Sequence, residues 1–257
     1  MVHLWLRAVP APDALLASAL VRDPAGPLLT FYDDATGERT ELSATSLANW
    51  VAKTANLLQD DVGCAPGDRV GVLLPAHWQT AAILLGAWTA AAVVSGSAAG
   101  AEAAFCIADR AGEATGAGEV FALSLIPLGR PFQAGPPAGT RDYSVDVLGQ
   151  GDRWTGRPVP DAVPALDTGS GTVTAGDLVE IALRRAAELG MIAGDRVLFS
   201  AGWDSPTSWV DGLLVPLAAG ASIVLVANPD PAALPHRVEA ERVTATLGLP
   251  VPGVRPL

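Results

Sequence analysis

The apolar residues of this chain gather in two stretches with the same order of expected elements. The first stretch, residues 67–94, reads GDRVGVLLPAHWQTAAILLGAWTAAAVV. After a Pro-Gly-Asp turn signal, Val70 to Leu74 is a short apolar run, typical of a strand buried on both faces. Pro75 ends that run, residues 78–91 predict a buried Ala-rich helix, and residues 92–94 begin another strand. The stretch therefore predicts a βαβ unit of a parallel sheet.

The second stretch, residues 194–226, reads GDRVLFSAGWDSPTSWVDGLLVPLAAGASIVLV and repeats this order. A helix is expected before each copy, at residues 44–58 and 175–189. A repeat of helix, strand, helix and strand predicts two similar lobes. The expected fold class is α/β, with mostly parallel sheets flanked by helices. We place the first lobe at residues 1–163, including a hairpin and a Pro/Gly-rich junction, and a truncated second lobe at residues 164–257.

The remaining pattern predicts shorter elements around the two copies. A helix is expected at residues 13–21, and a hairpin has its strands at 27–32 and 39–42. Ser43 is a suitable N-cap for the helix at 44–58. Further strands are expected at 103–108 and 120–128, with a turn at 111–118 between them. Residues 130–164, rich in Pro and Gly, are expected to be mostly irregular and to join the lobes.

Composition excludes several classes of partner. Half of the residues are apolar, which is enough for a sizeable core, and the formal net charge is −11. An acidic chain of this kind is a poor partner for nucleic acid or an anionic membrane. Cys64 and Cys106 are too few for a disulfide framework, which suits a cytoplasmic location. His3, His77 and His236 lack the spacing of a zinc site, so no metal site is expected.

One stretch invites a membrane interpretation. Residues 70–100 contain no Asp, Glu, Lys or Arg, and such a segment is long enough to span a bilayer. Gly71 and Pro75 interrupt it, however, and much of it is Ala, Gly, Ser and Thr. Buried helices of α/β folds have the same composition. We therefore expect this stretch inside the first lobe and no association with membranes.

The first copy carries a family resemblance. The motif GDRV-x-x-L-L-P, followed by an apolar Ala/Gly-rich helix, resembles the AMP-binding, adenylate-forming enzymes: acyl-CoA synthetases, luciferases and peptide-synthetase adenylation domains. The segments LTFYDDATGERTELSATSLANWVAKTANLL, GLLVPLAAGASIVLV and ERVTATLGLP are similar to further parts of that family. The resemblance runs from about Pro27 to Pro250. It implies the two-lobed N-terminal domain of these enzymes and an ATP-dependent activation of a carboxylate.

The resemblance also places a candidate nucleotide site. The family has a phosphate loop of the form T-S-G-T-T-G-x-P-K, whose backbone N–H groups and hydroxyls hold ATP phosphates. Residues 167–174 of this chain, DTGSGTVT, match its first half and lack the Gly-x-Pro-Lys half. The cofactor-binding residues that the resemblance implies are Thr168, Gly169, Ser170, Gly171 and Thr172. ATP or AMP with Mg²⁺ would bind only if this degenerate loop still holds phosphate. An ordinary turn is the alternative interpretation.

The lysines argue against catalysis. The resemblance implies two working lysines, one in the phosphate loop and one in a C-terminal domain. This chain has a single lysine, Lys53, in the helix expected at 44–58, where a solvated position is the simplest interpretation. The family's acidic motifs and its C-terminal domain would lie beyond Leu257. The chain is thus interpreted as a short, truncated relative, and no residue is assigned a catalytic role.

Other candidates are weaker. Ser200 does not stand in a G-x-S-x-G elbow. Asp204 follows Trp203 where the family often carries a His near the acyl pocket. Trp78, Trp203 and Trp209 could line a pocket between the lobes, although core packing is the commoner use of buried aromatic residues.

The expected function is that of a non-catalytic AMP-binding-like protein. It would bind a nucleotide, an acyl group or a protein partner in the cleft between the lobes. One alternative is an acyl-CoA synthetase-like ligase that activates a carboxylate with ATP. The other is a structural or regulatory partner that dimerises, either with itself or with another protein.

Overall fold

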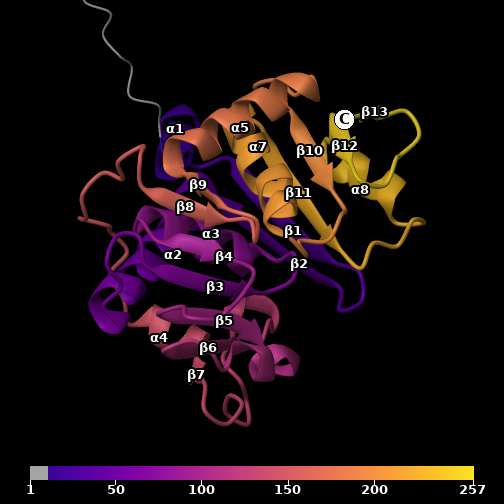
Figure 1. The fold of residues 1–257 in the computed structure, drawn as a ribbon. Coiled ribbons are helices and arrows are strands. Elements are labelled where there is room, and N and C mark those ends of the chain that lie inside the picture. Colours follow the sequence, from indigo (N-terminus) through magenta and orange to yellow (C-terminus); the bar gives the residue numbers. More distant parts are fainter. Residues whose placement is uncertain (1–10) are drawn as a thin grey trace, which may run out of the picture.

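The computed structural model describes residues 11–257, so His3 lies outside the described residues. Two sheets lie side by side with helices packed against them (Figure 1). The first has the order β7 (Arg141–Asp142), β6 (Glu119–Leu123), β5 (Ala103–Ile107), β3 (Arg69–Leu73), β4 (Val93–Ser95), β8 (Pro164–Asp167) and β9 (Thr172–Thr174). The second has the order β13 (Arg255–Pro256), β12 (Ala245–Leu247), β10 (Arg196–Phe199), β11 (Ser222–Ala227), β1 (Pro27–Asp33) and β2 (Glu38–Ser43).

Both sheets are mostly parallel. In the described chain, only the β1–β2 and β8–β9 pairs are antiparallel. The helices are α1 (Pro12–Arg22), α2 (Ala44–Asn56), α3 (Trp78–Thr89), α4 (Tyr143–Leu148), α5 (Ala175–Glu188), α6 (Pro206–Trp209), α7 (Val215–Ala219) and α8 (Leu234–Glu241). Two π-helical segments, η1 (Leu57–Val62) and η4 (Val210–Leu214), extend α2 and join α6 to α7, and two 3₁₀ segments are η2 (Ala108–Ala114) and η3 (Pro127–Gly129). The predicted α/β fold class is confirmed.

The internal repeat is present in the structure. The order α2, β3, α3, β4 recurs as α5, β10, α6 to α7, β11, and both strand pairs are parallel. Each first helix begins at a hydroxyl N-cap: Ser43 accepts a hydrogen bond from the Ser46 N–H, and Thr174 accepts one from the Asp177 N–H. The capping expected at Ser43 is therefore confirmed, and it has a counterpart in the second copy.

The two Gly-Asp-Arg turns share one geometry. Gly67 and Gly194 have φ values of 91° and 86°, which favour glycine. The Asp68 carboxylate accepts a hydrogen bond of 2.7 Å from the Ala65 N–H, and Asp195 accepts one of 2.9 Å from the Ile192 N–H. Each aspartate thus closes its turn through a hydrogen bond from the backbone three residues earlier.

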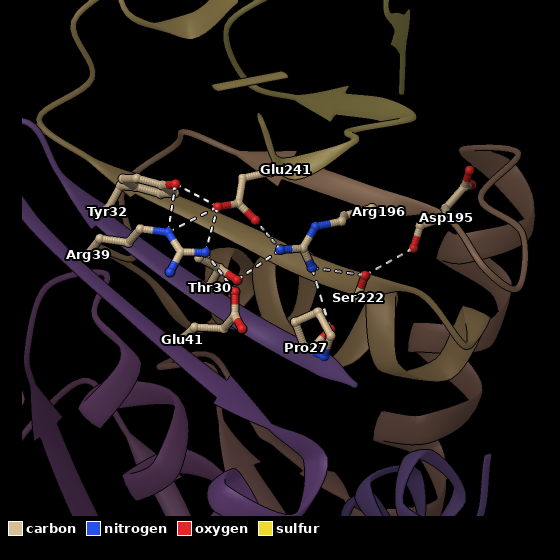
Figure 2. A network of polar contacts seen from close by, with 9 residues as sticks. All are labelled: Pro27, Thr30, Tyr32, Arg39, Glu41, Asp195, Arg196, Ser222 and Glu241. Carbon is tan, nitrogen blue, oxygen red and sulfur yellow. Dashed lines mark hydrogen bonds and ion pairs between the residues drawn. The ribbon is translucent and has the colours of Figure 1, made fainter. Parts of the chain in front are cut away.

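The arginine of the second turn is the centre of a buried polar network (Figure 2). Arg196 is paired with Glu241 of α8, and it donates a 2.8 Å hydrogen bond to the Thr30 hydroxyl of β1. Glu241 also accepts hydrogen bonds from Tyr32 at 2.6 Å and Arg39 at 2.9 Å. Burial alone would raise the pKa of Glu241, but hydrogen bonds from Tyr32, Arg196 and Arg39 hold this pKa at about 2. Glu241 is therefore ionised at neutral pH, and its network ties α8 to β1, β2 and β10.

The sheets do not divide where the sequence suggested, at residues 163 and 164. The hairpin β1–β2 belongs to the sheet built from residues 196–256, and the hairpin β8–β9 belongs to the sheet built from residues 69–142. Register pairs such as Leu29 with Ile223, and Val94 with Leu166, join segments far apart in the chain. Each sheet thus borrows one hairpin from the other half of the sequence.

Other differences have local causes. The strand expected at 120–128 ends at Leu123, because Leu125 has a φ of 51° that a strand cannot contain. The turn expected at 111–118 begins as the 3₁₀ segment η2. Residues 130–164 are not a plain junction: they contain β7 and α4, where the fully buried Tyr143 lies 2.8 Å from the Thr54 hydroxyl.

Lys53 is likewise not a solvated residue. Its side chain is 17% exposed, donates a 2.6 Å hydrogen bond to the Gln150 carbonyl, and is paired with Asp152. It ties α2 to the segment that follows α4.

The uncharged stretch lies inside the fold. Every residue of α3 is buried, and this helix packs closely against α2. A Cβ atom at Gly86 would lie 2.6 Å from the Thr54 Cβ, so this approach requires glycine. Among residues 11–257, no helix has both the length and the apolar character needed to cross a bilayer.

We predict that the Arg196–Glu241 pair is a major source of stability. Arg196→Met should lower the free energy of unfolding by about 3 kcal/mol, because it leaves a buried carboxylate with fewer donors. Urea unfolding followed by circular dichroism measures this loss. Arg184→Met is the matched control, because the Arg184 side chain is 68% exposed. Equal stability of the two variants would contradict the prediction.

Candidate functional site

A crevice of about 380 Å³ opens where strands of both sheets reach their carboxyl ends. Ligands of open α/β folds bind at this edge. The walls come from the ends of β1 and β11, the start of β2, and the loops after β3, β6 and β10. The lining residues are Phe31, Asp33, Glu38, Pro75, Ala76, His77, Leu125, Ser200, Ala201, Gly202, Trp203, Asp204, Val226, Ala227, Asn228 and Pro229.

His77 and Glu38 form a buried pair in the wall of the crevice. His77 is the N-cap of α3, and its Nδ1 accepts a 3.1 Å hydrogen bond from the Gln79 N–H. The neutral imidazole therefore carries its proton on Nε2, which lies 3.8 Å from Glu38 Oε2. The other oxygen of Glu38 accepts hydrogen bonds from Thr40 at 2.7 Å and Trp78 at 3.3 Å. The pair therefore brings the start of β2 next to the start of α3.

Burial sets the charge of this pair. Desolvation lowers the pKa of His77, and the nearby Glu38 carboxylate only partly opposes this shift. Burial raises the pKa of Glu38, but the nearby His77 and the hydrogen bonds from Thr40 and Trp78 more than compensate, so the net shift is downward. At neutral pH, His77 is therefore neutral and Glu38 is ionised.

Two further carboxylates line the crevice. Asp33 accepts hydrogen bonds from the Asn228 amide at 2.8 Å and the Ala35 N–H at 3.0 Å. The Asp204 carboxylate folds back over Gly202, where a Cβ atom would lie 2.5 Å from Asp204 Oδ2. Among the lining residues of the described chain there is no lysine or arginine. The crevice thus combines acidic groups with apolar walls.

The five residues of the predicted phosphate loop lie together in the turn between β8 and β9 and at the start of β9. The Thr168 N–H donates a 2.9 Å hydrogen bond to the Gly171 carbonyl, which closes a tight turn. The Thr168 hydroxyl lies 3.1 Å from the Ser170 hydroxyl and 3.0 Å from the Gly171 carbonyl. The Gly169 N–H donates to the Asp167 carboxylate at 2.9 Å. Three donors that could hold phosphate, the Thr168 N–H, the Thr168 hydroxyl and the Gly169 N–H, are therefore engaged within or beside the turn.

The nearest arginine contact to this turn is also occupied. Arg69 of β3 is paired with Asp167, which accepts a further hydrogen bond from Ser95 at 3.2 Å. The hydrogen bond from the Gly169 N–H lowers the pKa of Asp167 most, and Arg69 lowers it further. The carboxylate is therefore ionised at neutral pH. As it lies, the turn does not fit a triphosphate. Phosphate binding by Thr168 to Thr172 stays a prediction.

A groove of about 300 Å³ beside the turn contains two more arginines. Arg184 lies 3.8 Å from Glu188, and Arg185 lies 3.3 Å from Asp211. Each guanidinium faces a carboxylate. Nowhere in residues 11–257 do three or more His, Cys, Asp or Glu side chains cluster as a metal site would require.

The remaining candidates have structural roles. Ser200 lines the crevice, and its hydroxyl accepts a 2.8 Å hydrogen bond from the Leu249 N–H. Trp203 lines the crevice while its residue is only 1% exposed, and Trp209 donates a 3.0 Å hydrogen bond to the Trp203 carbonyl. Trp78 packs in the core, and its indole N–H donates a hydrogen bond to the Glu38 carboxylate.

Sequence reasoning missed His77, Glu38 and Arg69 as neighbours of candidate sites. One signal was present for His77. It follows Pro75, which ends a strand, and it opens a helix, so it had to lie at the carboxyl edge of the sheet. Glu38 and Arg69 had no comparable signal, because their partners come from distant segments.

Comparison with known proteins shows one strong sequence relative. No family model matches the chain. A protein of Mycobacterium tuberculosis (strain ATCC 25618 / H37Rv), described as a TIGR03089 family protein, is 50% identical over 245 residues. The match covers 91% of this chain and 96% of the relative.

Solved structures with the same fold are acyl-CoA ligases. The anthranilate CoA ligase AuaEII in complex with anthranoyl-AMP has a TM-score of 0.75 at 14% identity, over 96% of this chain and 51% of that one. Acetoacetyl-CoA synthetase from Streptomyces lividans has a TM-score of 0.72 at 19% identity, over 92% and 42%. The N-terminal domain of FACL13 from Mycobacterium tuberculosis has a TM-score of 0.68 at 16% identity, over 93% and 62%. The chain spans about half the length of these structures. At these identities, the likeness shows the fold alone.

We predict that His77 makes the protein less stable in mild acid. Its folded-state pKa lies below the ordinary value, so the unfolded chain binds the proton first as pH falls below about 6.5. Between about pH 7.5 and about pH 5.5, this one group should remove about 1 kcal/mol of stability. His77→Asn keeps a capping side chain and should remove that part of the pH dependence.

Urea unfolding at the two pH values measures the effect. His236→Asn is the control, since His236 is exposed on α8, and it should retain the wild-type slope. The same slope in His77→Asn and wild type would contradict the assignment.

Proposed function

The chain belongs to the TIGR03089 family, and we propose that it binds a small organic molecule in the crevice between its two sheets without adenylating it. The proposal combines the fold of the acyl-CoA ligases with the chemistry of this chain's own residues. It retains the expectation of a non-catalytic AMP-binding-like protein and commits to the crevice as the binding site.

The turn between β8 and β9 carries the proposal. Adenylation brings an anionic carboxylate to an anionic triphosphate, which requires donors and positive charge directed at the phosphates. In this chain, Thr168 and Ser170 lie within hydrogen-bond distance of each other, and Arg69 is paired with Asp167. Binding phosphate here would first require breaking those contacts. The arrangement therefore favours a protein that does not use ATP.

The crevice supports the binding half of the proposal. Its volume of about 380 Å³ falls within the range of small-molecule pockets. Phe31 and Trp203 provide apolar walls, and a few polar groups face the same space, which is the usual composition of a ligand site.

The ligase alternative has the shared fold in its favour. It would require positive charge at the phosphates from groups that are now paired, such as Arg69, or from another source. ATP or AMP with Mg²⁺ belongs to this alternative. No specific contact within the described chain supports dimerisation, which is the other alternative.

We predict no carboxylate-dependent exchange between pyrophosphate and ATP. The purified chain would be assayed with a panel of fatty, aryl and amino acids in the presence of Mg²⁺. Exchange is expected at the background rate because several donors of the turn are engaged within it and Arg69 is paired with Asp167. Ser170→Ala and Thr172→Ala should leave that background unchanged. Clear exchange that either substitution abolishes would establish the ligase alternative.

We also predict that ligands found by thermal-shift screening of small organic molecules occupy the crevice. Ala201→Trp should abolish their stabilising effect, because Ala201 is an exposed lining residue and an indole there would fill the space. Asp60→Asn, an exposed change outside the lining, is the control. Ligands that bind Ala201→Trp as well as wild type would place binding elsewhere.

A further inference from the structure

The crevice has a charge that does not suit the carboxylate substrates of acyl activation. Asp33, Glu38 and Asp204 all line it, and the lining contributed by the described chain includes neither lysine nor arginine. Two acidic groups within a few ångströms of a bound anion would repel it by about 1 kcal/mol each even in a water-like dielectric. The walls therefore disfavour an anionic head group and favour a cationic one.

Glu38 supplies an independent sign of a missing donor. The residue is 6% exposed, and hydrogen bonds from Thr40 and Trp78 reach only its Oε1 atom. Oε2 faces the Nε2–H of His77 at 3.8 Å, which is beyond hydrogen-bond distance. No hydrogen bond of the described chain reaches Glu38 Oε2, so this oxygen can still accept one from a donor on a ligand in the crevice.

The cations around the crevice do not neutralise it. Arg110 interacts with Asp204, but its guanidinium is held by Glu113 at 2.7 Å. Arg237 is paired with Asp34, next to Asp33, at 2.6 Å. Both arginines are thus engaged with other carboxylates, and the lining keeps a negative charge.

The remaining lining is apolar and of limited size. Phe31, Leu125 and Val226 face the space, and its volume of about 380 Å³ suits a molecule of the size of one aromatic ring with a short chain. An ammonium group carries three N–H donors and no acceptor, so it can meet several carboxylates at once. An apolar body next to it would be removed from water by the hydrophobic lining.

We propose that the crevice binds small primary amines: a protonated ammonium group among Glu38, Asp33 and Asp204, with an apolar body against Phe31, Leu125 and Val226. This inference rests on the proposed function, because it names the class of ligand for the same crevice. An ammonium ligand in the crevice would also distinguish this chain from an enzyme that binds a substrate carboxylate in the same position.

Isothermal titration calorimetry with three matched probes tests the proposal. Phenethylammonium, 3-phenylpropionate and 2-phenylethanol share a phenyl ring on a short chain and differ in head-group charge. The amine should bind at least about tenfold more tightly than the other two, and its affinity should fall as NaCl rises from about 0.05 M to about 0.5 M. Asp204→Asn should weaken amine binding about fivefold, a change that corresponds to one exposed charge. Asp60→Asn should leave it unchanged, and Ala201→Trp should abolish it.

The outcomes separate the ligand class from the proposed function. Tighter binding of the carboxylate or the alcohol, abolished by Ala201→Trp, would overturn the amine proposal and leave the crevice as the site. Amine binding that survives Ala201→Trp, or that Asp60→Asn weakens as much as Asp204→Asn, would also overturn it, because the charge effect would not be local. Absence of amine binding at millimolar concentration would overturn it as well. The exchange assay on the same preparation decides separately whether the chain adenylates carboxylates.

Discussion

Each half of this fold depends on an aspartate that closes a turn at the entrance of a central strand. The carboxylates of Asp68 and Asp195 bind backbone N–H groups three residues earlier, while Gly67 and Gly194 adopt the positive φ that the turn requires. The carbonyls of the two aspartates then accept hydrogen bonds of 2.8 and 2.9 Å from the first residues of the neighbouring strands. This fixes the alignment of β3 with β4 and of β10 with β11. The segments that follow β3, β10 and β11 then line the crevice at the carboxyl edge of the sheets.

The arginine that follows each aspartate forms an ion pair within the fold, which bears on the charge available to a ligand. Arg69 is paired with Asp167 next to the predicted phosphate loop, and Arg196 is paired with Glu241 at the end of α8. Both guanidinium groups thus hold segments that are distant in sequence. Since arginine supplies nearly all of the positive charge in this chain, arginines engaged in the framework leave little to neutralise a nucleotide. The crevice, with three carboxylates in its lining, has the opposite electrostatic character from an ATP site.

Local features of the fold could be predicted from sequence. The repeat, the Ser43 cap and the buried α3 follow from turn residues and apolar periodicity, which act over short distances. The exchange of hairpins between sheets could not be predicted, because it depends on pairs such as Val94 with Leu166. The same holds for Lys53, whose partners Gln150 and Asp152 lie about one hundred residues away in the chain.

The candidate site was predictable only in outline. A cleft between the lobes followed from the fold class, and the five residues of the phosphate loop do lie together in one turn. The pairing of His77 with Glu38 needed the three-dimensional structure, since a hairpin residue and a helix cap carry no sequence signal of their contact. The charge of the crevice likewise comes from segments that only the fold brings together.

Amide chemical-shift mapping by NMR tests the central claim most directly, because it reports the turn and the crevice in one experiment. The isotope-labelled chain would be titrated with Mg²⁺–ATP and, separately, with phenethylammonium. The account predicts that the amine shifts signals of residues 200–204, Asp33 and His77, and that ATP leaves residues 167–172 unperturbed. Saturable shifts of residues 167–172 with ATP, together with no amine-dependent shifts at residues 200–204, would contradict it.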